Sequence, residues 1–296
     1  MKRFHRLAAL GLSVAMLCSL LAGCGQSAAK DDASAAADTA TQGSASATQT
    51  DAAPVELTVF AAASMTETLS EIAEMYKEVA PNVTLVYNFD SSGTLKTQIQ
   101  EGADCDVFIS AGQKQMDQLD STADKAVNTE GLDFVEDTTR RNILENKVTL
   151  VVPEGNPAGI KSFQDLMTDK LKLLAIGNSD VPVGQYTLDI LTYLGTSAEE
   201  LAAAGKVTYG SNVKEVTTQV TEAAADAGVV YATDAYSAGL TVVDTATKDM
   251  CKQVIYPAAA LKTAAHPEEA GAFLDYLGTE DAAKVFEKVG FTVIQE

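Results

Sequence analysis

Serine and asparagine side chains stand where apolar, strand-like runs give way to helical patterns. The first such junction, FAAAS, offers Ser64, and the second, NFDSSGTL, offers Ser91 and Ser92. The third and fourth, VPVGQY and SNVKEV, begin their helical patterns near Pro182 and Asn212. These residue types favour helix N-termini, whose unpaired N–H groups carry a partial positive charge. Several helix starts at one place would bind an anion without any lysine or arginine.

Two of these junctions carry the capping-box pattern, in which a glutamate follows the capping residue by three positions. The pairs are Ser64 with Glu67 and Asn212 with Glu215. Either helix is by itself an ordinary capped helix, and the sequence does not show that the four helix starts converge.

The elements that would position these residues alternate from residue 55 onward. Apolar runs predict strands near residues 56–61, 83–88, 106–110, 147–152, 172–176, 206–209, 228–232 and 254–261. Amphipathic stretches predict helices near residues 65–79, 94–101, 113–119, 163–168, 185–194, 198–204, 213–225, 267–277 and 280–288. This alternation is typical of an α/β protein with largely parallel sheets, which bind ligands at the carboxyl ends of their strands.

The N-terminus has the layout of a lipoprotein export signal. Basic residues precede an apolar run, residues 7–22, that is too short for a stable membrane span. The run ends in LLAGC, which resembles the bacterial lipobox, so residues 1–23 are predicted to be a signal peptide and Cys24 to carry lipid. The alternative is an ordinary cleaved signal with an incidental cysteine. Residues 24–54 are rich in Ala, Ser and Thr and are predicted to form a disordered tether behind the lipidated cysteine.

The net charge of −20 argues against nucleic acid as a partner and against electrostatic binding to anionic lipid. The membrane is therefore expected to be reached through the lipid anchor only. The overall field also repels anions, so an anion site must attract its ligand locally, with aimed dipoles.

Five sequence words, FAAASM, FDSSGTL, DVFISA, DVPVGQY and GVVYATDA, resemble in this order the periplasmic molybdate-binding proteins of ABC importers. The resemblance covers Val55 to Phe291. It implies an α/β fold of the type 2 periplasmic binding protein class, with two lobes and a ligand cleft between them. From the layout of strands and helices we expect lobe 1 to comprise residues 55–142 plus 256–296, and lobe 2 residues 143–255.

The resemblance also implies a binding site, because neutral donors alone hold a tetrahedral dianion in that family. Serine hydroxyls and a tyrosine hydroxyl contribute, together with backbone N–H groups. The matching words place the ligand-binding residues at Ser64, Ser92, Val183, Val213 and Tyr231. Ser91 is the alternative to Ser92, and the two valines would act through their backbone N–H groups. Asp90 departs from the pattern, since a carboxylate in contact would repel a dianion, and we expect it to face solvent or cap the turn.

A site made only of donors selects among oxyanions. Phosphate keeps a proton at neutral pH and needs an acceptor, whereas sulfate, molybdate and tungstate need none. The resemblance favours molybdate or tungstate; sulfate stays an alternative, and Asp90 keeps phosphate as a minor one. We therefore expect a monomeric lipoprotein anchored outside the cytoplasmic membrane, on the cell surface or the periplasmic face. It would deliver the oxyanion to the permease, and through it to the ATPase, of an ABC transporter.

Other function classes fit less well. Ser64 at a strand-to-helix turn suggests a serine-dependent hydrolase, but the G-x-S-x-G pattern is absent, and His266 directly precedes a predicted helix start at Pro267. A purely structural surface lipoprotein is a further alternative. No metal-ligand spacing occurs, so we expect no cation site, with molybdenum bound only as its oxyanion. We also expect no enzyme activity and no cofactor. Cys105 and Cys251 are expected to be free thiols, although a disulfide is chemically possible.

Overall fold

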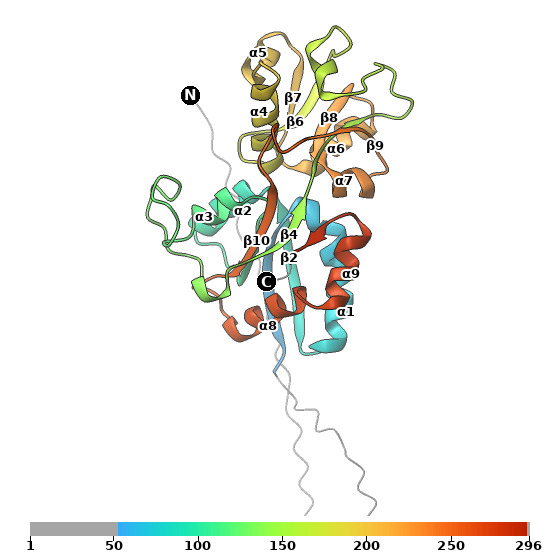
Figure 1. Ribbon diagram of the computed structural model, residues 1–296. Coiled ribbons are helices and arrows are strands. Elements are labelled where there is room, and N and C mark those ends of the chain that lie inside the picture. Colours follow the sequence, from blue (N-terminus) through green and yellow to red (C-terminus); the bar gives the residue numbers. More distant parts are fainter. Residues whose placement is uncertain (1–52, 295–296) are drawn as a thin grey trace, which may run out of the picture. The chain divides into compact units, whose positions relative to one another are not determined.

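The computed structural model describes residues 53–294. The predicted signal peptide (1–23), Cys24 and nearly all of the tether (24–54) therefore lie outside the described residues. The described part contains two β-sheets, each with its own helices (Figure 1). Within this part, no helix combines the length and the apolar character that a membrane crossing requires.

The first sheet has the strand order β11-β4-β10-β3-β1-β2. Strands β1, β2 and β3 pair in parallel, and β4, β10 and β11 add antiparallel pairs. Its strands are β1 (Val55–Ala62), β2 (Val83–Asp90), β3 (Val107–Ile109), β4 (Arg141–Asn146), β10 (Val254–Ala260) and β11 (Thr292–Val293). Its helices are α1 (Thr66–Val79), α2 (Ser92–Gln100), α3 (Gln113–Asp117), α8 (Pro267–Leu277) and α9 (Glu280–Lys288), with 3-10 turns η1 (Ala63–Met65) and η2 (Asp137–Thr139).

The second sheet has the order β7-β6-β8-β5-β9. Its strands are β5 (Val148–Val152), β6 (Leu174–Gly177), β7 (Val207–Gly210), β8 (Ala227–Tyr231) and β9 (Thr241–Thr245). Its helices are α4 (Pro182–Tyr193), α5 (Ala198–Ala203), α6 (Val213–Thr221) and α7 (Ala232–Ser237), with the 3-10 segment η3 (Phe163–Met167). Every residue of β5 and β8 is buried, as expected of strands covered on both faces.

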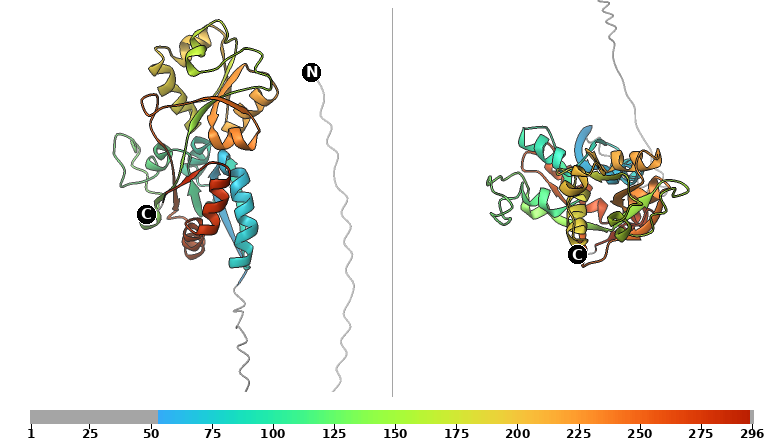
Figure 2. Two further views of the ribbon diagram at one scale, coloured as in Figure 1. Left: turned by 45° about the vertical axis from the view of Figure 1, so that its right-hand side comes forward. Right: turned by 90° about the horizontal axis from the view of Figure 1, so that it is seen from above.

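We call the first sheet with its helices lobe 1 and the second sheet with its helices lobe 2. The chain passes from lobe 1 to lobe 2 between β4 and β5 and returns between β9 and β10, and the turned views in Figure 2 show the same division. The predicted α/β architecture with two lobes is confirmed. The predicted boundaries at 142/143 and 255/256 fall inside β4 and β10. The assignment of residues to lobes stays a prediction.

Several elements differ from the prediction, each for a local reason. Strand β4 was not expected, because RNILEN is largely polar, and β9 was missed because it is an exposed edge strand. Strand β11 and helix α7 are too short to show a period. Residues 163–167 form the 3-10 segment η3 in place of the helix expected at residues 163–168. Helix α4 begins at Pro182, earlier than expected, because proline suits the first helical position.

Candidate functional site

A small cavity lies where the ends of strands from lobe 1 meet the helix starts of lobe 2. Its lining includes four of the five predicted binding residues and the alternative serine, namely Ser64, Ser91, Ser92, Val213 and Tyr231. The free volume there is about 10 Å³, close to the lower limit for a single water molecule, so the residues around it are nearly in contact. The structure thus brings these residues together, while their role in binding stays a prediction.

Ser64 does not cap α1, contrary to the capping-box prediction. It lies in the 3-10 turn η1, and the residue at the N-cap of α1 is Met65, which makes no side-chain cap hydrogen bond. The Ser64 hydroxyl is instead hydrogen-bonded to the phenol of Tyr256 on β10, with 2.9 Å between the oxygens. The extra turn between strand and helix explains the error, because it shifts the start of α1 past Ser64.

Tyr256 fixes the direction of this hydrogen bond. Asn146 Nδ2 donates to the Tyr256 hydroxyl at 3.2 Å and to Thr233 Oγ1 at 2.9 Å, while Asn146 Oδ1 accepts from Lys147 N at 2.8 Å. Within the described residues, Ser64 Oγ is the one acceptor in reach of the phenol hydrogen, so the arrangement that satisfies both hydroxyls has Tyr256 donating to Ser64 Oγ, and the hydrogen of Ser64 then remains available to the cavity. Burial raises the pKa of Tyr256 well above its usual value, so the phenol stays a donor. No local signal in VIYPAAA marked this tyrosine.

The start of α2 supplies the second hydroxyl. Ser91 is the N-cap, and its Oγ accepts from Thr94 N at 3.1 Å and lies 2.8 Å from Thr94 Oγ1. Ser92 is fully buried, and its Oγ accepts from Ala111 N at 2.9 Å, which leaves its hydrogen for another acceptor. Ser92 is therefore the better donor of the two, because the Ser91 hydroxyl already has a hydrogen-bond partner in Thr94 Oγ1.

Asp90 caps the turn, which is one of the two positions expected for it. Its Oδ1 accepts from Ser91 N at 2.7 Å and from Asn212 Nδ2 of lobe 2 at 3.3 Å. Asn212 in turn caps α6, since its Oδ1 accepts from Glu215 N at 3.1 Å. The reciprocal bond of the predicted capping box is shifted by one residue, because Glu215 Oε2 accepts from the N–H of Ser211, at 2.7 Å, and not from that of the N-cap Asn212. Oδ1 of Asp90 thus accepts from donors that hold the turn and join the lobes.

Helix α4 reaches the cavity through its first residues. Val181 and Pro182 line it, but the side chain of Val183 is fully buried elsewhere. Val183 occupies the second helical position, whose N–H has no intrahelical acceptor, so a backbone contribution is compatible with its place. Gly184 lets α4 start this close to β6, because a Cβ there would lie 2.4 Å from the carbonyl oxygen of Gly177.

Tyr231 and Val213 complete the lining from lobe 2. Tyr231 ends β8, and its hydroxyl donates to the carbonyl of Ala111 in lobe 1 at 3.3 Å, a long hydrogen bond. Burial raises the pKa of the phenol well above its usual value and keeps it protonated. Val213 is the first residue of α6, so its N–H lacks an intrahelical partner. Ala111 was missed by the sequence analysis, although it contacts both Ser92 and Tyr231.

The electrostatics of the cavity come from dipoles. Asp90 is the only carboxylate in the lining, and within the described residues no lysine, arginine or histidine lines it. Ser64 pairs with a tyrosine rather than with His266, which stands at the N-cap of α8 and does not line the cavity. No group of metal-ligating side chains occurs in residues 53–294. Cys105 and Cys251 are both free.

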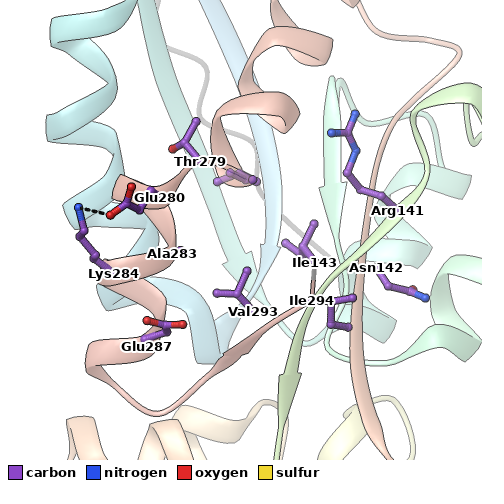
Figure 3. A pocket seen from close by; sticks show the side chains of 12 residues that line it. Arg141, Asn142, Ile143, Thr279, Glu280, Ala283, Lys284, Glu287, Val293 and Ile294 are labelled. Atoms are coloured by element: carbon purple, nitrogen blue, oxygen red, sulfur yellow. Dashed lines mark ion pairs between the residues drawn. The ribbon is translucent and has the colours of Figure 1, made fainter. Parts of the chain in front are cut away.

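A larger cavity, of about 770 Å³, lies within lobe 1 between α8, α9 and the strands β4 and β11 (Figure 3). Glu280, Lys284 and Glu287 line it, and Glu280 pairs with Lys284 at 3.2 Å. None of the predicted binding residues reaches this cavity. The predicted binding residues thus converge on the small cavity between the lobes and not on this larger one.

Comparison with known proteins gives a consistent picture. The profile of the bacterial extracellular solute-binding protein family matches residues 57–292. The chain is 35% identical to the putative ABC transporter substrate-binding lipoprotein YvgL of Bacillus subtilis, over 80% of this chain and 86% of that protein. It is 36% identical to the molybdate-binding protein ModA of Escherichia coli, over 80% of this chain and 89% of that protein.

Two solved structures of binding proteins are also similar to this chain. The substrate-binding domain of a putative molybdenum ABC transporter from Clostridium difficile matches with a TM-score of 0.59 and 33% identity, over 81% of this chain and 100% of that one. The sulfate-binding protein SubI of Mycobacterium tuberculosis matches with a TM-score of 0.67 and 16% identity, over 81% of this chain and 88% of that one. The second likeness concerns the fold alone.

Proposed function

The chain belongs to the family of bacterial extracellular solute-binding proteins, and from this premise we propose that it captures molybdate or tungstate for an ABC importer. The predicted two-lobe periplasmic binding protein fold and the resemblance to molybdate-binding proteins are both confirmed. The ligand itself, its delivery and the anchor are the proposal.

The observation that carries the proposal is a small cavity whose lining brings together neutral donors from both lobes, with Asp90 as its one carboxylate. Ser64 and Ser92 each have a hydroxyl hydrogen left after their oxygens accept, and Tyr231 adds a phenol. The helix start at Val213 adds an N–H group, and the N–H of Val183 in the first turn of α4 is a further candidate, although Val183 itself does not line the cavity. Such a set stabilises a fully deprotonated tetrahedral oxyanion, because each oxygen of the anion needs only donors.

Phosphate fits this site less well. Its remaining proton at neutral pH needs an acceptor, and the only carboxylate of the lining is Asp90. Asp90 Oδ1 already accepts from Ser91 and Asn212, so Oδ2 is the one oxygen of this carboxylate that could accept the proton of phosphate. Sulfate needs no acceptor and differs from molybdate mainly in size, which makes it the competitor that an experiment must test.

The test is a calorimetric titration of the purified protein with molybdate, tungstate, sulfate and phosphate. We expect tight binding of molybdate and tungstate, with at most weak binding of sulfate and phosphate. Tight binding of sulfate together with weak binding of molybdate would replace the proposed ligand. If none of the four anions binds, the oxyanion function has to be abandoned.

The route of delivery follows from the family and from the N-terminal sequence. We place the protein outside the cytoplasmic membrane, lipidated at Cys24 and tethered by residues 24–54, as a monomer that meets the permease of an ABC transporter. The name of the Bacillus subtilis relative, a putative substrate-binding lipoprotein, supports the anchor. No cofactor and no catalytic step are required for this role.

A further inference from the structure

Lys214 connects the two lobes beside the cavity. Its Nζ lies 2.8 and 2.9 Å from the two carboxylate oxygens of Glu67, on α1 of lobe 1. On its other side, Nζ lies 3.3 Å from Oδ1 of Asp234, on α7 of lobe 2. One ammonium group therefore stands between a carboxylate of its own lobe and a carboxylate of the opposite lobe.

Asp234 fixes the lysine within lobe 2. Its side chain is completely buried, and neither carboxylate oxygen has a hydrogen bond of good geometry. A buried carboxylate is costly unless a charge compensates it, and the ammonium of Lys214 is the cation beside it. The lysine is thus held by its own lobe, independently of where lobe 1 lies.

Glu67 makes the contact that depends on the other lobe. Its side chain is 49% exposed and that of Lys214 30% exposed, so both groups keep water access. This ion pair lies next to the cavity, because Glu67 comes three residues after Ser64 and Lys214 directly follows Val213, and both Ser64 and Val213 line the cavity. The pair therefore ties together the two segments that cover the cavity from opposite lobes.

We propose that Lys214 is a positioning residue that holds the start of α6 against lobe 1 and thereby sets the residence time of the bound oxyanion. The inference rests on the proposed oxyanion-binding function and adds to it one of the contacts that hold the two lobes together over the cavity. Release of the ligand requires the lobes to separate, and separation breaks the bond of Lys214 to Glu67 while leaving that to Asp234.

The chain contains a matched control for this contact. Glu71 lies one turn further along α1, and its side chain is also 49% exposed. It pairs with Lys288 of α9, at 3.1 and 3.3 Å, and both residues belong to lobe 1, where α1 and α9 run side by side (Figure 2). Glu67→Gln and Glu71→Gln therefore remove the same charge from the same helix, but only the first removes a contact between lobes.

The experiment measures molybdate dissociation from the purified protein and these variants. Protein loaded with molybdate is mixed with excess tungstate, and the molybdenum that remains bound is quantified over time. We expect Glu67→Gln to raise the dissociation rate about threefold, as for a partly exposed ion pair, and Glu71→Gln to leave it unchanged. In a Lys214→Met background, the additional effect of Glu67→Gln should disappear.

The outcomes separate the two proposals. If wild-type protein binds neither molybdate nor tungstate, the proposed function fails, and the inference falls with it. If wild-type protein binds but Glu67→Gln and Glu71→Gln dissociate at the wild-type rate, the inference alone is overturned. An equal acceleration by both variants would also overturn it, because that would be an effect of net charge rather than of the contact between lobes.

Discussion

Gly93→Ala should prevent the lobes from meeting while leaving each lobe folded. Gly93 is the glycine of the SSGTL word, and its N–H donates across the lobes to the carbonyl of Asp180 at 3.0 Å. A Cβ added to Gly93 would lie 2.2 Å from that carbonyl oxygen and 2.8 Å from the Cβ of Asp180. Ordinary contact begins near 3.4 Å, so the backbone of one lobe would have to move away from the other.

Gly93→Ala should destabilise the arrangement in which the two lobes are in contact, without destabilising helix α2. Gly93 lies in the first turn of α2 with a helical backbone, and alanine has the higher helix propensity, so α2 itself is not strained. Overpacking at the contact costs about 2 kcal/mol, and the lost hydrogen bond to Asp180 about 1 kcal/mol. The sum of about 3 kcal/mol corresponds to a dissociation constant raised ~100-fold.

Two measurements test this prediction. Calorimetry should show molybdate binding weakened by about two orders of magnitude, and thermal unfolding without ligand should show a midpoint equal to or slightly above that of the wild type. Gly271→Ala is the control, because Gly271 lies within α8 and a Cβ there meets nothing within 4 Å. Wild-type affinity in Gly93→Ala would refute the argument, since it would mean that ligand binding does not require this contact between the lobes.

Three further predictions concern the site, the buried acid and the anchor. Tyr231→Phe should weaken molybdate binding by about 1.5–3 kcal/mol, the range for a hydrogen bond to a charged partner, and unchanged affinity in calorimetry would remove Tyr231 from the site. Burial raises the pKa of Asp234 to about 6, although Lys214 acts to lower it. The folded protein therefore binds a proton on the Asp234 carboxylate more tightly than the unfolded chain does, which contributes up to about 3 kcal/mol to the free energy of unfolding. This contribution is fully present below about pH 4 and is lost as the pH rises through about 6. Asp234→Asn should lack this component, so denaturant unfolding at pH 4 and pH 7 should give a wild-type-minus-variant difference that falls with pH, whereas a constant difference would contradict the assignment. Cys24→Ala should release the protein from membranes with its affinity intact, which cell fractionation and titration would check, and a variant that stays membrane-bound would exclude lipidation at this residue.

Sequence reasoning succeeded where the chemistry is local. Ser91 and Asn212 are N-caps, as their residue types and following helical patterns predicted, because a cap bonds to a backbone N–H only three positions away. It failed where the partner is distant in the chain. Ser64 was expected to cap α1, but its partner Tyr256 is 192 residues away, and no local pattern reports such a contact.

Sequence reasoning also could not predict that the helix starts meet at one cavity. The four helix starts could be found one by one, but their meeting at one cavity depends on how two sheets face each other, which periodicity does not encode. Ala111 shows this well, since an alanine in DVFISA carries no sign that its N–H meets Ser92 and its carbonyl meets Tyr231. The resemblance to a known family supplied the convergence that the residues alone could not.

The hydrogen-bond chain behind Ser64 begins at the places where the polypeptide changes lobes. Asn146 is the last residue of β4, immediately before the first crossing, and Tyr256 lies near the start of β10, just after the second. The orientation of the serine hydroxyl is therefore set by the same segments that would bend when the lobes move apart. A rotation of the lobes about these two crossings would move Asn146 and Tyr256 and, with them, the hydrogen-bond partner of the Ser64 hydroxyl. Redesign of the pocket for a different anion would then have to treat the hinge as part of the binding site.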